Sequence, residues 1–480
     1  MISERVMNER SPHFARVAVV GGGLAGLAAG SALAENGFHV TLFERRSYLG
    51  GRASSYQHPG TGEVVDNCQH VLLGCCTNLI EFYRRIGVEN KIRWFDQLTF
   101  LEPGGRASVI RSSWLPAPFH TAPAFLRATC LNLADKLAVA AAMAALAPLT
   151  PSDNGETFLT WLRRHGQTDG AINRFWKTVL VSALNEELEN VSVRSAAQVI
   201  RESFLKSATA GRMGIPTVPL SDLYSAAGDY ICARGGAVEF RCNVESFRAE
   251  PAQVKLLVSG QEQIFDFVIL AVPFDVLCRL LPRTSAAEPL QQSLAHFETS
   301  PITGIHLWFD RQITELEHAV LLDRTIQWMF HKSKLFAAGR HGFSDAAASN
   351  GSYVELVVSS SKSLVEKSRA EIIDMALKEL CEFFPAARDA NLIKSTVIKE
   401  IHATYSPRPG IDAYRPGSQT AWPRVFLAGD WTATGWPATM EGAVRSGYVA
   451  AQYVARVAGQ RRVAFLTPDL PAAGFMRLFG

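Results

Sequence analysis

Short apolar runs bounded by glycine and polar residues recur along the chain, and the first of them lie near its amino terminus. Residues 17–20 read VAVV, a β-branched run typical of a buried strand. The segment from about 24 to 36 has the small and apolar residues of a helix packed on a sheet, and a second apolar run covers 40–43. This order of strand, helix and strand predicts an α/β fold with a parallel, doubly wound sheet.

The strand pattern returns twice later in the chain. GGAVEFRCNVESFRAE reads as a glycine turn followed by a strand, and FDFVILAVPFDVL is a buried strand that ends at Pro273. VFLAGD is an apolar strand ending in Gly429 and Asp430, and a helical pattern begins at about Met440. We therefore expect one Rossmann-like dinucleotide-binding domain assembled from residues 14–76, 229–285 and 411–462.

The intervening segments have a different composition. Residues 77–228 are helix-rich and carry the apolar stretches LPAPFHTAPAFL and DKLAVAAAMAALAPL. Residues 286–410 mix strands, such as GIHLWF and SYVELVVSS, with a helix around 371–384, and residues 463–480 form an apolar tail. We expect 77–228 and 286–410 to form one discontinuous α+β substrate domain. The apolar stretches are expected to be core helices, with membrane contact as the alternative, because periodicity cannot separate the two.

Composition narrows the class of protein. The chain has 480 residues, 48% of them hydrophobic, and a net charge of +3, which gives no footprint for nucleic acid. Its 8 cysteines contain no CxxC pair and its 12 histidines no HExxH cluster, so we expect a reducing, cytoplasmic location and no bound metal. The apolar segment 17–30, VAVVGGGLAGLAAG, holds five glycines, which argues against a signal peptide or a transmembrane helix.

The glycines after the first strand match GxGxxG. Gly21 permits a tight turn, Gly23 lets backbone amides approach a pyrophosphate, and Gly26 allows the helix to pack closely on the sheet. The helix amino terminus would then face the phosphates. Glu44 follows the second strand, where a carboxylate binds ribose hydroxyls and favours FAD or NAD over NADP. Glycine-rich turns also occur in ordinary loops, but here strand, glycines, helix, strand and acid occur in the required order.

Two more segments carry candidate ligands of a dinucleotide. RRSYLGGRASS begins with Arg45 and contains a turn, Gly50 to Arg52, that places a cation near the expected pyrophosphate. Gly429 and Asp430 stand at a strand end, where ligands bind in doubly wound folds.

These motifs are similar to those of known flavoproteins. GGGLAGLAAG, LGGRASS and GDW with TGWPATMEGAVRSG together resemble the flavin-containing amine oxidase and phytoene desaturase superfamily. DNCQHVLLGCCTNL and AGDWTATGWPATMEGAVRSG resemble, more closely, the squalene-associated FAD-dependent desaturases, also called hydroxysqualene dehydroxylases. The resemblance implies an amine-oxidase-like FAD-binding domain of the GR2 type. One departure is Cys68, at a position where this family is expected to have glycine.

The resemblance also implies roles for individual residues. Gly21, Gly23 and Gly26 would hold the FAD pyrophosphate, Glu44 the adenosine ribose, and Gly51 and Arg52 the phosphate or flavin side. The remaining implied contacts are the Val244 backbone with adenine, Gly429 and Asp430 with the ribityl chain, and the Met440 and Glu441 amides near the flavin ring. Because no cysteine follows Cys381, the attachment of FAD is expected to be noncovalent.

The implied reaction is reductive removal of the hydroxyl of hydroxysqualene, which gives squalene. Asp66 and His70 are the candidate acids that would protonate the departing oxygen. The plainer interpretation is that Asp66 caps or braces a turn and that His70 is a hydrogen-bonded core histidine. An apolar isoprenoid substrate, an unidentified electron donor and peripheral contact with the inner membrane face are the expected partners. Carotenoid or phytoene desaturation, amine oxidation and a non-catalytic scaffold that binds FAD or lipid remain alternatives.

Overall fold

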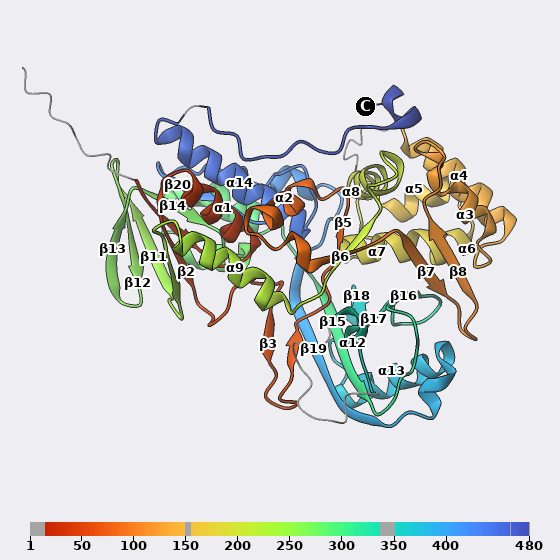
Figure 1. Cartoon of the computed structure of the whole chain (residues 1–480). Coiled ribbons are helices and arrows are strands. Elements are labelled where there is room, and N and C mark those ends of the chain that lie inside the picture. The colour runs from red at the N-terminus through yellow and green to blue at the C-terminus, as the bar shows by residue number, and fades with distance from the viewer. Residues whose placement is uncertain (1–14, 149–154, 337–350, 461, 480) are drawn as a thin grey trace, which may run out of the picture.

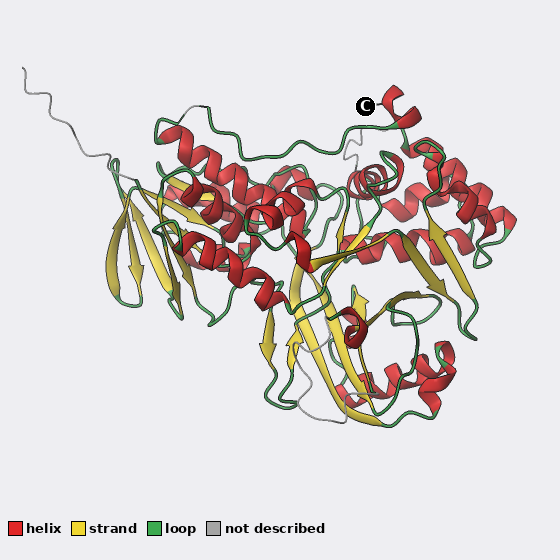
Figure 2. Cartoon of the chain, viewed as in Figure 1, coloured by secondary structure: helices red, strands yellow, loops and turns green. Residues whose placement is uncertain are grey.

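A parallel sheet, a mixed sheet and a group of helices make up the computed structural model of the chain (Figure 1). The structure describes residues 15–148, 155–336, 351–460 and 462–479. The predicted segments 14–76, 77–228, 286–410, 411–462 and 463–480 each include residues outside this range. Strands dominate one end and the lower centre of the molecule in Figure 2, and helices dominate the opposite end.

The parallel sheet has five strands in the order β10-β2-β1-β14-β20. Its strands are β1 (Arg16–Val20), β2 (His39–Glu44), β10 (Ala237–Phe240), β14 (Phe267–Leu270) and β20 (Val425–Leu427). All four neighbouring pairs are parallel. The sheet confirms the α/β class predicted from the apolar runs.

Alternate residues of these strands face different layers, as the two-residue period of a strand requires. Val17 and Val19 pack toward helices α1 (Leu24–Glu35) and α14 (Met440–Val457). Ala18 and Val20 pack in the core beneath an antiparallel sheet of β11 (Val244–Ala249), β12 (Val254–Val258) and β13 (Gln261–Phe265). Helices α10 (Phe274–Leu280) and α11 (Glu288–Leu294) contribute to the same core.

The second large sheet has seven strands in the order β19-β15-β18-β17-β16-β7-β8. Its neighbours are antiparallel apart from the parallel pair β16–β7. Helix α13 (Arg369–Phe383) packs on it. The strands are β7 (Gln97–Leu101), β8 (Ala107–Arg111), β15 (Thr299–Phe309), β16 (His318–Leu321), β17 (Trp328–His331), β18 (Ser352–Ser359) and β19 (Leu392–Tyr405).

The helical group has its own core. It comprises α3 (Ala122–Arg127), α4 (Leu133–Leu146), α5 (Phe158–Arg164), α6 (Asp169–Ala171), the π-helical turn η3 (Ile172–Trp176), α7 (Lys177–Leu184), α8 (Val193–Ile200) and the π-helical turn η4 (Arg201–Leu205). The expectation that the apolar stretches are core helices is only half right. Within the second stretch, Val139 and Leu146 of α4 are buried, but Leu137 is exposed, as is Leu133 just before it.

The core assigns two helices differently from the predicted boundaries. Helix α2 (Thr77–Arg85) and helix α9 (Leu220–Cys232) pack with α1 in the core of the parallel sheet, although both were expected in the substrate part, α9 in large part. The segment 463–479 is not a free tail, because Phe465 packs in that same core and Met476 packs in the helical group. It therefore ties the two ends of the molecule together (Figure 1).

Small sheets join the large ones. Strands β3 (Ser55–Gln57) and β4 (Val64–Asp66) form a hairpin, and β9 (Met213–Pro216) pairs with β5 (Leu72–Leu73) and β6 (Ile92–Phe95). The chain from 66 to 72 therefore runs between two pinned strands. Among the described residues, every helix is too short or too polar to cross a membrane.

Candidate functional site

A cavity of about 740 Å³, the nucleotide cavity, lies where the parallel sheet meets the segment after β4. Ten of the twelve residues predicted to bind the cofactor line it: Gly21, Gly23, Glu44, Arg45, Gly51, Arg52, Val244, Gly429, Asp430 and Met440. They come from three separated parts of the chain. The structure thus brings the three predicted segments to one place, at the carboxyl ends of β1, β14 and β20.

The first glycine turn has the geometry that a phosphate site needs. Gly21 has φ +111°, and a Cβ there would lie 2.5 Å from the Ala271 carbonyl oxygen. Gly26 lies behind the cavity, where a Cβ would be 1.9 Å from the Gly21 oxygen, so it permits the close helix–strand packing that its spacing predicts. Helix α1 begins after Gly23 with no side-chain cap among the described residues and no acid in its first turn. Its first amide N–H groups are therefore available to donate hydrogen bonds to a bound anion.

A second glycine turn rests on the first. The Gly50 amide donates to the Gly22 oxygen at 2.9 Å. Gly51 has φ +63°, and a Cβ there would lie 2.9 Å from the Gly23 Cα, so only glycine fits. The two turns form a backbone cradle that faces the cavity.

Glu44 is held in place at the end of β2. Its carboxylate accepts hydrogen bonds from the Gly22 amide at 2.8 Å and the Arg46 amide at 2.7 Å, and the side chain is buried. Each oxygen keeps a lone pair for a ribose hydroxyl. Arg45 is exposed at the rim, while Arg46, which the sequence did not single out, lines the cavity and donates to the Gly51 carbonyl at 3.0 Å.

Arg52 and Asp430 form an ion pair across the cavity wall. The guanidinium lies 2.5 Å from the Asp430 carboxylate and donates to the Ala403 carbonyl at 2.8 Å. This pair joins the second glycine turn to the end of β20, which are 378 residues apart. The roles predicted for Arg52, at the phosphate or flavin side, and for Asp430, at the ribityl chain, stay predictions.

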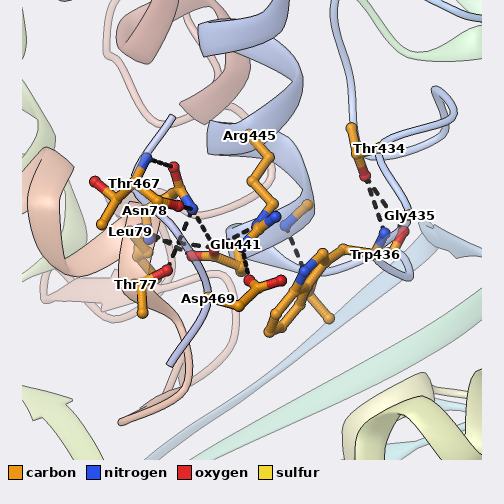
Figure 3. A network of polar contacts seen from close by, with 12 residues as sticks. Thr77, Asn78, Leu79, Thr434, Gly435, Trp436, Glu441, Arg445, Thr467 and Asp469 are labelled. Atoms are coloured by element: carbon orange, nitrogen blue, oxygen red, sulfur yellow. Dashed lines mark hydrogen bonds and ion pairs between the residues drawn. The ribbon is translucent and has the colours of Figure 1, made fainter. Parts of the chain in front are cut away.

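Glu441, whose polar contacts are drawn in Figure 3, is one of the two predicted cofactor residues that are not among the cavity-lining residues. Its fully buried carboxylate accepts from the amides of Asn78 at 3.2 Å and Leu79 at 2.8 Å, and pairs with Arg445 at 2.7 Å. Helix α2 has no side-chain cap of its own, so Glu441 caps it from α14. The side chain thus ties α2 to α14, whereas the neighbouring Met440 lines the cavity.

Asp66 also caps a helix. Its carboxylate accepts from Ser55 Oγ at 2.5 Å and from the first amide of α9, at Leu220, at 3.2 Å. It is buried outside the cavity lining. Burial alone would raise the pKa of Asp66, but the Lys332 ammonium and these hydrogen bonds lower it, so the group stays ionised. The catalytic role predicted for Asp66 is therefore replaced by the plainer interpretation of a structural cap.

His70 does line the cavity. Its Nδ1 lies 2.7 Å from the Cys68 carbonyl oxygen, which can only accept, so Nδ1 carries a proton. Nε2 makes no hydrogen bond with any other described residue and is left for a ligand. Burial lowers the pKa of His70, so its protonated form is a stronger acid than an exposed imidazolium. Cys68, the departure from the family pattern, thus holds the imidazole through its backbone.

A buried ion cluster stands behind this wall. Lys332 is 1% exposed and contacts Asp66 at 2.6 Å, Glu355 at 3.3 Å and the Gln69 amide oxygen at 2.7 Å. Burial raises the pKa of Glu355 to about 7 although Lys332 opposes the shift. The sequence carries no signal for Lys332, because 266 residues separate it from Asp66 and no motif surrounds it.

The residues of the nucleotide cavity fit a flavin dinucleotide. Two glycine turns that a Cβ would fill, an uncapped helix amino terminus and a buried carboxylate beyond β2 match pyrophosphate and ribose. Gly429 and Met440 supply the third segment.

Comparisons with known proteins agree with this geometry. Residues 24–455 match the family model for flavin containing amine oxidoreductase. The chain is 27% identical to a probable zeta-carotene desaturase of Synechococcus elongatus, over 91% of this chain and 98% of the relative. It is also 27% identical to a 15-cis-phytoene desaturase of Narcissus pseudonarcissus, over 91% of this chain and 79% of the relative.

Solved structures share the fold. Putrescine oxidase bound to putrescine aligns with a TM-score of 0.68 at 17% identity, over 92% of this chain and 99% of the other. An oxidoreductase from Methanosarcina mazei aligns with a TM-score of 0.67 at 18% identity, over 90% of this chain and 98% of the other. The chain therefore belongs to the flavin-containing amine oxidoreductase family and is an FAD-dependent oxidoreductase of the amine oxidase and carotenoid desaturase superfamily.

Proposed function

We propose that this protein removes the hydroxyl of hydroxysqualene by reduction and releases squalene. One observation carries the proposal. The segment 66–79, on which the resemblance to hydroxysqualene dehydroxylases depends, supplies the stretch from Asn67 to Val71 to the wall of the nucleotide cavity. The residues that mark the narrower family thus face the residues that would hold the cofactor.

FAD would be bound without a covalent link. No cysteine follows Cys381 in the carboxyl-terminal flavin segment. Of the cysteines that line the cavity, Cys68 is buried, and burial raises the pKa of its thiol well above the usual range. A thiol kept protonated is a poor nucleophile. Flavin colour that stayed with the denatured, precipitated protein would contradict this.

Reduced FAD, when bound, supplies a hydride. The reaction replaces a C–OH bond with a C–H bond at the allylic carbon, and the oxygen leaves as water once it gains a proton. His70 is the residue we assign to that proton: in its doubly protonated form Nδ1–H stays on the Cys68 carbonyl while Nε2–H gives its proton to the departing oxygen, which leaves the imidazole neutral. Apolar side chains around it, such as Val71 and Ile302, exclude water from the departing group.

Desaturation of a long polyene is the second candidate. The desaturase relatives are 27% and 26% identical to this chain, whereas putrescine oxidase is 17% identical, which favours desaturation over amine oxidation. In that reaction the hydride moves from substrate to the oxidised cofactor, so the direction of transfer separates the two candidates.

An anaerobic single-turnover experiment tests the proposal. Holoprotein is reduced with dithionite and mixed with hydroxysqualene, and products and flavin absorbance are followed together. We expect squalene to form in step with flavin reoxidation. No reaction with hydroxysqualene, together with oxidation of phytoene by the oxidised protein, would favour desaturation instead.

We also propose that the helical end contacts an anionic membrane. Trp114, Leu133 and Leu478 are 90%, 69% and 78% exposed there, and Phe119 packs against Phe475 to join their segments. The cations Arg111, Arg127 and Arg477 are exposed on the same segments. Asp135, which is buried, is the only acid between residues 107 and 147. Apolar anchors with a cationic rim suit an anionic lipid surface.

Co-sedimentation with vesicles tests this contact. We expect binding to vesicles that contain anionic lipid, weakened by Leu133→Asp with Leu137→Asp and by added salt. Wild-type protein that stays in the supernatant at low salt would refute the contact.

A further inference from the structure

A second cavity, the apolar cavity, lies within the helical group and has a volume of about 410 Å³. Aromatic and aliphatic side chains of several elements form its wall, among them Phe125, Leu131, Val139, Met143, Phe175 and Val179. Phe119 and Phe475, which also line it, are about half exposed. The cavity therefore reaches the face that we propose to contact the membrane.

Both π-helical turns in the described part of the chain line this cavity. Turn η3 contributes Phe175, and turn η4 contributes Phe204 and Leu205. π-Helical turns are rare and occur often at functional sites, because they widen a helix at the expense of regular hydrogen bonding. Two of them around one cavity indicate that its shape is specified by the fold and is more than a packing defect.

One helix runs from this cavity to the nucleotide cavity. Phe175 and Val179 line the apolar cavity, while Ser182 and Ala183 line the nucleotide cavity. These positions are three or four residues apart and share one helix face. Val179 and Ser182 are about 4.5 Å apart along the axis. The two cavities therefore lie end to end along α7.

Trp328 of β17 packs beside both cavities, although it is not among the residues that line either of them. Its indole Nε1 donates to Ser182 Oγ at 2.8 Å. Its ring packs against the cluster that includes Leu131 at the apolar cavity, and also against the cluster that includes Cys68 at the nucleotide cavity. Trp328 thus lies behind the lining of both cavities, and one hydrogen bond holds its ring to a residue of the nucleotide cavity.

We propose that the apolar cavity is a second binding site, which takes the unreacted half of a long linear isoprenoid, and that Trp328 is the partition which such a chain displaces. The inference rests on the proposed function. A bound dinucleotide would occupy much of the nucleotide cavity, whose wall includes both glycine turns and the carboxylates of Glu44 and Asp430. A thirty-carbon chain with its reacting carbon near His70 needs further apolar space, and α7 leads to it.

Binding of squalene and of farnesene, an isoprenoid of half its length, tests the proposal in the FAD-loaded protein. Val179→Trp fills the apolar cavity, and Val179→Ala is the matched control that enlarges it. We expect Val179→Trp to weaken squalene binding at least tenfold and farnesene binding less than twofold, with unchanged flavin content. Val179→Ala should bind both ligands within threefold of the wild type.

Met143→Trp, on helix α4 at the same cavity, repeats the test in case Val179→Trp does not fold. Squalene affinity within twofold of the wild type in a folded Trp variant would overturn the second site. Failure of the wild-type protein to bind squalene would instead count against the proposed function. For the partition, Trp328→Phe keeps a ring but loses the bond to Ser182. We expect squalene to associate at least threefold faster and farnesene unchanged, and equal squalene rates would overturn the role of Trp328.

Discussion

The nucleotide cavity and the apolar cavity are specified by different kinds of information. The cradle of the nucleotide cavity comes from residues 21–51, where a Cβ at Gly21, Gly26, Gly50 or Gly51 would meet a backbone atom that leaves no room for it. The apolar cavity is built by packing between distant elements, where any apolar side chain of similar volume serves. A backbone constraint requires glycine at fixed positions, so it is visible as a sequence motif. A packing constraint requires only apolar side chains of suitable volume, so it is visible only in the composition of a segment.

The wall of the nucleotide cavity at residues 67–71 is a third case. Lys332, Asp66 and Glu355 lie behind it as a buried ion cluster joined across long sequence distances. Because its charges are buried, this cluster tolerates substitution as poorly as the glycine turns do, although no local sequence pattern marks it. The following changes test whether the three kinds of constraint differ in strength as this comparison requires.

The largest effect is expected at Lys332. Lys332→Met leaves Asp66 and Glu355 buried without their cation, which costs about 3–5 kcal/mol of stability. Lys334→Met is the matched control, because that ammonium pairs with the exposed Glu315, and exposed ion pairs contribute little to stability. Denaturant unfolding of the holoprotein measures both. Equal shifts of the unfolding midpoint in the two variants would show that the cluster is not a constraint.

Gly26→Ala tests the glycine turns. The new Cβ would lie 1.9 Å from the Gly21 oxygen, so helix α1 must move off the sheet. We expect a loss of about 3 kcal/mol and a lower flavin content. At the exposed Gly417, no described atom lies within 4 Å of where a Cβ would stand, so Gly417→Ala should change stability by about 0.5 kcal/mol or less. Full flavin content in Gly26→Ala would break the comparison.

His70→Gln separates chemistry from structure. We expect single-turnover reduction of hydroxysqualene to slow by about a hundredfold, the lower range for a general acid, with flavin content unchanged. Burial lowers the pKa of His70 below its usual 6.5, so the wild-type rate should fall as pH rises through that lowered value. The variant should lose this pH dependence. A variant that keeps the wild-type rate and profile would remove His70 from the mechanism.

Glu355→Gln should give the smallest effect. The pKa of Glu355 is raised from 4.5 to about 7, so the folded state binds a proton more tightly than the unfolded chain. This contribution to stability is complete below pH 4.5 and is lost as pH rises through about 7. We expect the variant to remove roughly 1–3 kcal/mol of that pH dependence, measured by unfolding at pH 5 and pH 8. An unchanged pH dependence would place the titration elsewhere.

Local chemistry explains what could be predicted from the sequence. The first strands, the helix after Gly21, the three GxGxxG glycines and Glu44 followed from spacing within single segments, whereas the calls on Val244 and Met440 came from the resemblance to known flavoproteins. The capping contacts of the Glu441 and Asp66 carboxylates could not be predicted, because each carboxylate caps a helix that is far away in the sequence and close only in the tertiary fold. Trp328 and Ser182, 146 residues apart, carry no motif at all. The predicted segment boundaries at residues 77 and 229 do not follow the observed cores, because α2 and α9 pack with α1 in the core of the parallel sheet.

A crystal structure of the FAD-loaded protein with squalene would test whether the dinucleotide and one long isoprenoid chain occupy the two cavities together. We expect a dinucleotide along the two glycine turns and Asp430, and one continuous chain that passes His70 and a displaced Trp328 to end beside Phe175. A dinucleotide elsewhere, or a chain confined to one side of an unmoved Trp328, would contradict this expectation.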